Sequence, residues 1–160
     1  MKIKIWILFA FLSISTLSFS QNTAIYRAER EKTHNLIHTK LKVNFNFDKK
    51  ELNGEAWVTA KPHFYATNVF TLDAKAMLFD EISLNGTQLN YDYDDAQIVI
   101  KLPKKYTKEE KFTIYLKYTA RPEKVKEKGS AAITSAKGLY FINADGADKN
   151  KPTQIWTQGE

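Results

Sequence analysis

Three histidines, His34, His38 and His63, are the residues of this 160-residue sequence whose type suits metal binding. The four-residue spacing of His34 and His38 favours zinc only on one face of a helix, but the alternating pattern that follows predicts a strand, which separates the two rings widely. No cysteine is present to complete a tetrahedral ligand set, and the HExxH motif is absent. We therefore expect structural or surface histidines, and neither a metal site nor a catalytic residue in this chain.

Two further kinds of chemistry lack the residues that they need. A serine nucleophile is favoured by a Gly-x-Ser-x-Gly turn, which the sequence does not contain. Asp92, Asp94 and Asp95 could suggest calcium, but the EF-hand loop pattern is absent and acidic residues are common in turns. We expect these three aspartates to serve the turn.

The start of the sequence is typical of an export signal. Lys2 and Lys4 precede an apolar run over 5–12 that is too short to span a membrane, and the small residues Ser18 and Ser20 follow. We predict a signal peptide cleaved after Ser20, with an uncleaved membrane anchor as the alternative. The mature protein is then periplasmic, associated with the cell envelope or secreted, and has no integral membrane span. The lack of cysteine excludes a lipoprotein anchor and disulfides.

The remaining length and charge indicate one domain that does not bind nucleic acid. Removing the signal leaves 160 − 20 = 140 residues, enough for one substantial core, and lowers the net charge from +6 to +4. The lysines between 104 and 128 are interleaved with glutamates, which is typical of a solvated surface.

The elements that must position any site are predicted to be strands. Residues 21–33 are expected to form an arm or short helix, residues 34–160 a β-domain, and Gly54 a bulge or a point of close approach. Between Arg121 and Lys137 we expect a mobile connection. The period-two pattern predicts an all-β, mostly antiparallel β-sandwich or saddle-like domain, with strands at Leu41–Phe47, Leu52–Ala60, Val69–Leu72, Ile82–Leu84 and Leu89–Tyr93 around Asn85-Gly86, Ile98–Leu102 ended by Pro103, Phe112–Tyr118, Gly138–Ile142 and Gln154–Gln158.

Three runs resemble the N-terminal β-domain of the aminopeptidase N family of zinc metallopeptidases (peptidase family M1). Within that family they are most similar in character to the exported bacterial members. They are IHTKLKVNFNFDKKELNGEAWVTAKPHFYATNVFTLDAKAM, GSAAITSAKGLYFIN and KPTQIWTQGE. The similarity covers about Tyr26 to Glu160. Its sharpest part is the Gln-x-Glu signature of the family, which Gln158-Gly159-Glu160 matches.

The resemblance implies a hydrolase that removes N-terminal residues from peptides with a free N-terminus. In such an enzyme the β-domain packs against a catalytic domain that binds zinc. By position, Glu160 would bind the α-ammonium of the substrate, Gln158 would shape the first subsite, and Gly159 would allow close approach. Because HExxH and the other catalytic residues are missing, we expect the sequence to be the front portion of a longer enzyme, stopping within a strand before the catalytic domain, and inactive alone.

A free-standing exported binding module for carbohydrate or an envelope partner is the alternative. Its contacts would be exposed aromatic residues such as Trp57, Tyr65, Tyr91 and Tyr93. At strand spacing, aromatic residues are more often core residues or cross-strand pairs.

Overall fold

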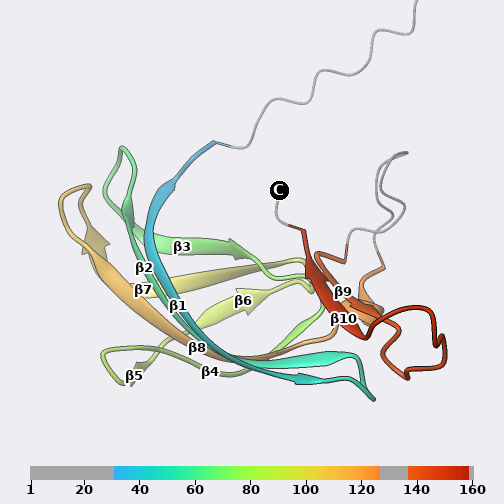
Figure 1. Ribbon diagram of the computed structural model, residues 1–160. Helices are drawn as coiled ribbons and strands as arrows, with labels where there is room; N and C mark the ends of the chain where they lie inside the picture. The colour runs from blue at the N-terminus through green and yellow to red at the C-terminus, as the bar shows by residue number, and fades with distance from the viewer. Residues whose placement is uncertain (1–30, 127–136, 159–160) are drawn as a thin grey trace, which may run out of the picture. The chain divides into compact units, whose positions relative to one another are not determined.

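The structure, a computed structural model, describes residues 31–126 and 137–158 (Figure 1). Every element described lies in one compact unit, residues 32–160. Its elements are β1 (His34–Asn46), β2 (Glu51–Pro62), β3 (Thr67–Asp73), β4 (Met77–Leu84), β5 (Thr87–Gln88), β6 (Tyr91–Tyr93), β7 (Gln97–Tyr106), β8 (Phe112–Ala120), the 3-10 helix η2 (Pro122–Lys124), β9 (Leu139–Ile142) and β10 (Gln154–Thr157).

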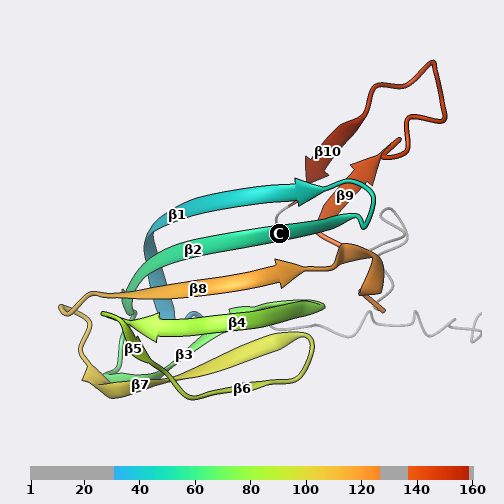
Figure 2. The same cartoon turned by 90° about the horizontal axis from the view of Figure 1, so that it is seen from below.

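The strands form three antiparallel sheets. A five-stranded sheet has the order β1-β2-β8-β4-β5, a three-stranded sheet the order β3-β7-β6, and β9 pairs with β10 alone. Figure 2 shows the three-stranded sheet beside the β4 side of the larger sheet, with β1 at the opposite edge. The all-β, antiparallel expectation is confirmed. Among the described residues, none forms a helix of the length and apolarity that crossing a membrane requires.

The core lies between the five-stranded and three-stranded sheets. Alternate residues of β2, namely Ala56, Val58 and Ala60, are buried, because a strand turns every second side chain to the same face. They belong to one apolar cluster with Phe70 on β3, Ile98 and Ile100 on β7 and Ile82 on β4. Small residues on β2 leave room for the large side chains of the second sheet.

The predicted Asn85-Gly86 hairpin is present between β4 and β5. Asn85 has φ 52° and Gly86 has φ 79°, the positive values that a tight hairpin turn requires. β6 then leaves this sheet, because Tyr91 and Tyr93 pair with Ile100 and Ile98 of β7.

Pro103 does not end its strand, so that prediction is wrong. β7 continues to Tyr106. The pairing of β3 with β7 jumps from Val69–Lys101 to Thr67–Tyr106, and β6 pairs only as far as Ile100. Pro103 therefore lies in an irregular stretch, where its missing N–H removes no bond of a regular ladder.

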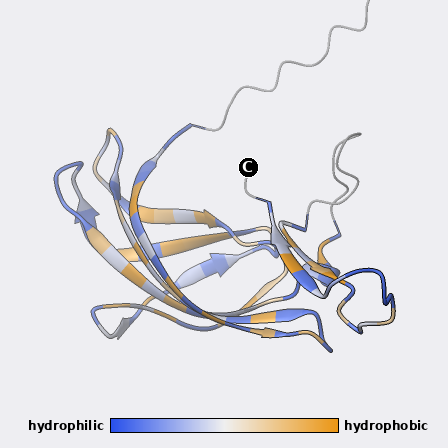
Figure 3. Cartoon of the chain, viewed as in Figure 1, coloured by the Kyte–Doolittle hydropathy of each residue, from blue (hydrophilic) through white to orange (hydrophobic). Residues whose placement is uncertain are grey.

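β1 is longer and more exposed than its alternation predicts. It begins at His34 rather than Leu41, and Leu41 and Val43 are 57% and 39% exposed. Leu41 stands opposite the buried Ala56 and so shares its face. No residue of β1 belongs to the core cluster, and this edge strand extends beyond the part of the sheet that the core covers. Figure 3 shows its alternating hydrophobic and hydrophilic bands.

Most other boundaries agree with the sequence to within two residues, but β4 begins at Met77 rather than Ile82. The predicted strand Leu89–Tyr93 is also wrong in part, since only Tyr91–Tyr93 forms a strand and the hairpin partner of β4 is Thr87–Gln88. Residues 31–33 have no regular structure, and the rest of the proposed arm, the signal peptide over 1–20 and most of the connection after Arg121 (127–136) lie outside the described residues. The last strand ends at Thr157 rather than Gln158.

Candidate functional site

Gln158 is the one residue of the Gln-x-Glu triplet that the structure describes, and it directly follows the hairpin of β9 and β10. Thr157 pairs with Leu139, and the backbone N–H of Gln158 then donates to the carbonyl oxygen of Gly138 at 2.9 Å. Gly138 has φ 70°, a conformation that glycine adopts without a steric penalty. The backbone at Gln158 is thus fixed to the neighbouring strand, while its side chain is exposed. Gly159 and Glu160 lie outside the described residues.

One asparagine organises the connection between these two strands. The Asn143 side chain donates to the carbonyl oxygens of Asp148 (2.9 Å) and Lys151 (2.6 Å), and its Oδ1 accepts the N–H of Asp148 (3.0 Å). The Thr153 hydroxyl donates to the carbonyl oxygen of Asn143 at 3.0 Å. Asn143 has φ 48°, which asparagine tolerates better than most residues. These bonds hold 143–153 as an ordered loop, a role that the sequence analysis missed although Asn and Asp-Gly are turn signals.

The same hairpin packs against the far end of β1 through aromatic rings. Phe141 is buried, and its ring lies edge-on to those of Phe45 (6.3 Å) and Phe47 (5.6 Å). Trp156 is 62% exposed, and its Nε1 donates to Oε1 of Gln154 at 2.7 Å. One face of the hairpin is therefore anchored, while an indole and two amide side chains remain accessible.

The three histidines occupy three different environments. The His34 ring lies edge-on to Phe70 (5.0 Å) and Phe112 (6.1 Å), and burial lowers the pKa of its imidazole. His38 is exposed on β1, and His63 packs on Phe64 with ring centroids 4.0 Å apart. Within residues 31–126 and 137–158, no three His, Cys, Asp or Glu side chains gather in a way that could hold a metal ion.

Asp94 and Asp95 stabilise the turn between β6 and β7, as expected. Oδ1 of Asp94 accepts the backbone N–H groups of Gln97 (2.6 Å) and Ala96 (2.9 Å), and these bonds lower the pKa of its carboxyl group. Asp95 takes a positive φ of 73°. Asp92 lies on β6 and forms an ion pair with Lys101 of β7 at 2.8 Å, so the prediction that it serves the turn is wrong.

Three of the four aromatic residues proposed as module contacts contact other groups of the fold, although Tyr91 remains 37% exposed. Trp57 stands opposite Tyr115 with ring centroids 5.2 Å apart, and Tyr91 lies against Phe79. The Tyr93 hydroxyl accepts the N–H of Met77 and donates to the carbonyl oxygen of Ala74, both at 2.8 Å. Tyr65, by contrast, is 80% exposed.

A polar cleft of about 320 Å³ lies where β1, β2 and β8 run side by side. Glu55 accepts hydrogen bonds from the Lys42 ammonium at 2.9 Å and from the Tyr115 hydroxyl at 3.1 Å. These two bonds, of which the one from Lys42 has the larger effect, lower the pKa of the Glu55 carboxyl group. Gly54 belongs to the lining, and the Tyr118 ring lies over it. Lys42 and Glu55 form an ion pair across β1 and β2, and Lys117 and Asp80 are the other charged residues of the lining.

Comparison with known proteins finds similarity in structure only. No protein-family model matches the sequence, and no curated protein matches it. A mutant of a two-domain M1 zinc metallopeptidase bound to L-tryptophan superposes with a TM-score of 0.57 at 16% identity, covering 67% of this chain and 24% of that one. The M1 zinc metallopeptidase of Deinococcus radiodurans gives 0.54 at 16%, covering 69% and 26%.

A yeast protein shows the same fold. Native yeast LTA4 hydrolase gives a TM-score of 0.52 at 16% identity over 79% of this chain and 20% of its own. The chain thus spans about a quarter of the length of the first two structures and a fifth of the yeast structure. At such identities the likeness concerns the fold: this chain shares the fold of a β-sheet region found in M1 zinc metallopeptidases.

Proposed function

We propose that this chain is the N-terminal, substrate-anchoring domain of an exported zinc aminopeptidase. The observation that carries the proposal is that a chain with the fold of M1 metallopeptidases holds Gln158-Gly159-Glu160 directly after β10. The neighbours with this fold are several times longer than the region matched, which supports a catalytic domain following residue 160.

In this proposal Glu160 binds the α-ammonium of a peptide substrate. A carboxylate in a desolvated site needs a cation, and a free N-terminus supplies one through charge-assisted hydrogen bonds. Such pairing selects peptides by their N-terminus and makes the enzyme an exopeptidase. Gln158 offers a neutral amide beside it, and Gly159 lets the backbone approach the substrate because it carries no side chain.

The hairpin offers the rigidity that such an anchor requires. The bond from Gln158 to Gly138 fixes the backbone two residues before Glu160, and Phe141 packs the hairpin on β1. Groups that bind a substrate act best when the elements that carry them are rigid. This arrangement supports the assignment of the triplet as a positioned site.

Zinc belongs to the proposed enzyme but not to the described residues. The histidines do not fit a zinc site, since His34 packs between phenylalanine rings and no acidic or histidine cluster joins it. The ligands would come from the proposed second domain. The contribution of this domain is then binding and orientation of the peptide amine.

Reading the coding sequence beyond codon 160 tests the proposal first. A continuing frame with HExxH supports the enzyme, and a stop codon with no such domain contradicts it. In the intact enzyme, Glu160→Gln keeps the shape of the side chain but removes its charge. We expect catalytic efficiency on free peptides to fall roughly tenfold to a few hundredfold, with zinc content and folding unchanged.

A paired substrate assay separates this role from a general defect. Activity on an N-acetylated peptide should change little in the Glu160→Gln variant, because that substrate has no ammonium. Gln158→Ala should give a smaller loss than Glu160→Gln. Equal losses on the free and acetylated peptides would show that Glu160 is not the amine anchor.

A further inference from the structure

The loop between β2 and β3 exposes two aromatic rings to solvent. Phe64 is 65% exposed and Tyr65 is 80% exposed. Their ring centroids lie 6.4 Å apart, and His63 packs on Phe64 at 4.0 Å, so the three consecutive rings form one cluster in which neighbouring rings are tilted against each other. Exposing two adjacent aromatic residues costs solvation free energy, and nothing in the core requires them here.

Further apolar side chains gather at the same end of the domain. The carbonyl oxygen of Thr33 accepts the N–H of His63 at 2.8 Å, which places the start of β1 beside the aromatic loop. Leu36 and Ile37 follow on β1 and are 61% and 43% exposed. Leu36 stands opposite Ala60, close to the end of β2. The loop and the start of β1 together make an exposed apolar end.

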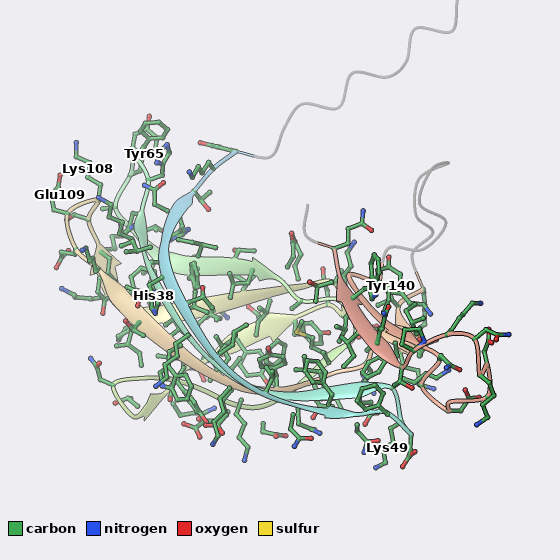
Figure 4. All side chains as sticks on the ribbon, viewed as in Figure 1. His38, Lys49, Tyr65, Lys108, Glu109 and Tyr140 are labelled. Carbon is green, nitrogen blue, oxygen red and sulfur yellow. The ribbon has the colours of Figure 1, made fainter. Side chains whose placement is uncertain are left out.

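The turn between β7 and β8 brings positive charge to this end. Thr67 pairs with Tyr106, so residues 107–111 lie beside the aromatic loop, and Figure 4 shows Tyr65 and Lys108 near each other and Lys49 at the opposite end. Residues 104–111 contain four lysines (Lys104, Lys105, Lys108 and Lys111) and two glutamates (Glu109 and Glu110). Lys104 pairs with Glu110 at 2.6 Å and Lys108 lies 3.8 Å from Glu109. This leaves a net charge of 4 − 2 = +2, carried beside exposed rings.

We propose that this end of the domain docks reversibly on an anionic lipid surface. Phe64 and Tyr65 enter the interfacial region, where aromatic rings with polar tips are favoured, and Lys105, Lys108 and Lys111 face the lipid phosphates. Exposed rings and lysines act together here, because a lipid interface binds protruding apolar residues that have cations beside them. The inference goes beyond the proposed aminopeptidase function and does not depend on it.

The shape of the surface favours a lipid over a protein partner. A stable protein interface buries about 800 Å² on each partner and needs complementary packing. A protruding loop tip with two rings next to lysines suits a bilayer interface, which adapts to a tip of any shape. Each lysine near an anionic surface strengthens binding by about fivefold, so a few such residues give measurable but reversible binding.

Vesicle co-sedimentation with the chain from Gln21 tests the proposal. The core lies wholly within residues 32–160, a compact unit, and leaving out the apolar N-terminal segment removes its own affinity for lipid. We expect binding to vesicles of equimolar phosphatidylglycerol and phosphatidylcholine, with little binding to phosphatidylcholine alone. High salt should weaken it.

Two pairs of variants separate the aromatic and the charged contributions. Phe64→Ser with Tyr65→Ser, and separately Lys108→Glu with Lys111→Glu, should each weaken partitioning into anionic vesicles on the order of tenfold or more. The matched controls remove an exposed apolar pair elsewhere (Leu78→Ser with Trp156→Ser) or reverse two lysines elsewhere (Lys49→Glu with Lys149→Glu).

The outcomes decide the proposal directly. Circular dichroism should show an unchanged fold in every variant, since the substituted side chains are exposed. No binding of the wild type to anionic vesicles overturns the proposal, and capture of a protein by this end without lipid binding has the same effect. Equal losses in the control pairs also overturn it, because binding would then follow overall charge or hydrophobicity rather than this end of the domain.

Discussion

Gly54 shows how a missing side chain makes room for a ring from the neighbouring strand. A Cβ atom built at this position would lie 2.6 Å from Cζ of Tyr118, which stands opposite on β8. Burial raises the pKa of the Tyr118 hydroxyl. The predicted close approach at Gly54 is therefore confirmed, and the register around it is regular, so the predicted alternative of a bulge is wrong.

Gly54→Ala should destabilise the domain by roughly 1–3 kcal/mol, because the tyrosine ring must move from a packed position. Urea unfolding of the chain from Gln21 measures the loss. In a Tyr118→Leu background the same substitution should cost much less, since the side chain that it meets is gone. An equal cost in both backgrounds would contradict the contact as its cause.

His34 predicts a dependence of stability on pH. Burial lowers the pKa of its imidazole below the ordinary 6.5, so the folded state favours the neutral ring. The stability that the neutral ring permits is fully present above pH 6.5 and is lost as the pH falls below 6.5 toward the lowered folded pKa. His34→Phe should flatten this part of the profile, while His38→Gln, at an exposed position, should leave it unchanged. The measurement is the urea midpoint across mildly acidic pH, and an unchanged slope in His34→Phe would contradict the prediction.

At the scale of elements, Asn143 decides whether the β9–β10 connection is an ordered loop. Its side chain makes three hydrogen bonds to the loop, and its backbone takes a positive φ. Asn143→Gly keeps that backbone conformation accessible and removes only the side-chain bonds. We expect local stability to fall by roughly 1–3 kcal/mol, seen as faster amide exchange over 143–153.

A neighbouring asparagine serves as the control for that experiment. Asn150 donates its backbone N–H to Asp148, a bond that Asn150→Ala retains. Amide exchange in the Asn150→Ala variant should stay close to that of the wild type. Exchange that rises equally in both variants would show that Asn143 has no special role.

At the scale of the whole molecule, exposed edges predict self-association. β1 is the edge of its sheet and carries exposed Leu36 and Leu41, and β10 pairs with β9 alone among the described strands. Trp156 is exposed on β10. Unpaired strand edges with apolar side chains favour pairing between chains.

A chain from Gln21 to Glu160 should therefore associate as its concentration rises. Light scattering after size-exclusion chromatography measures the mass, and Trp156→Lys should shift the equilibrium toward monomer because a charge opposes edge pairing. In the longer enzyme of the proposed function, the sequence after residue 160 should have the same effect if it covers the edge. A monomer at every concentration would contradict this prediction.

The sequence alone determined the local structure of this protein. Alternation placed β2, β4 and β8 because the strand period of two is a local property, and Asn85-Gly86 fixed its hairpin because positive φ at both positions depends on residue type. The resemblance of the runs also predicted the fold that M1 zinc metallopeptidases share. The roles of Gln158, Gly159 and Glu160 stay predictions.

Only the tertiary structure decided which predicted faces are covered. Leu41 and Phe70 look alike as apolar strand residues, yet Leu41 is exposed and Phe70 is buried, because Leu41 lies on the edge strand outside the apolar cluster that the two sheets share. Pro103 remains inside β7 because no regular ladder bond is formed there. Burial and pairing depend on neighbours far away in the sequence, which no local pattern records. The same long-range pairing brought Tyr65 and Lys108 to one end of the domain.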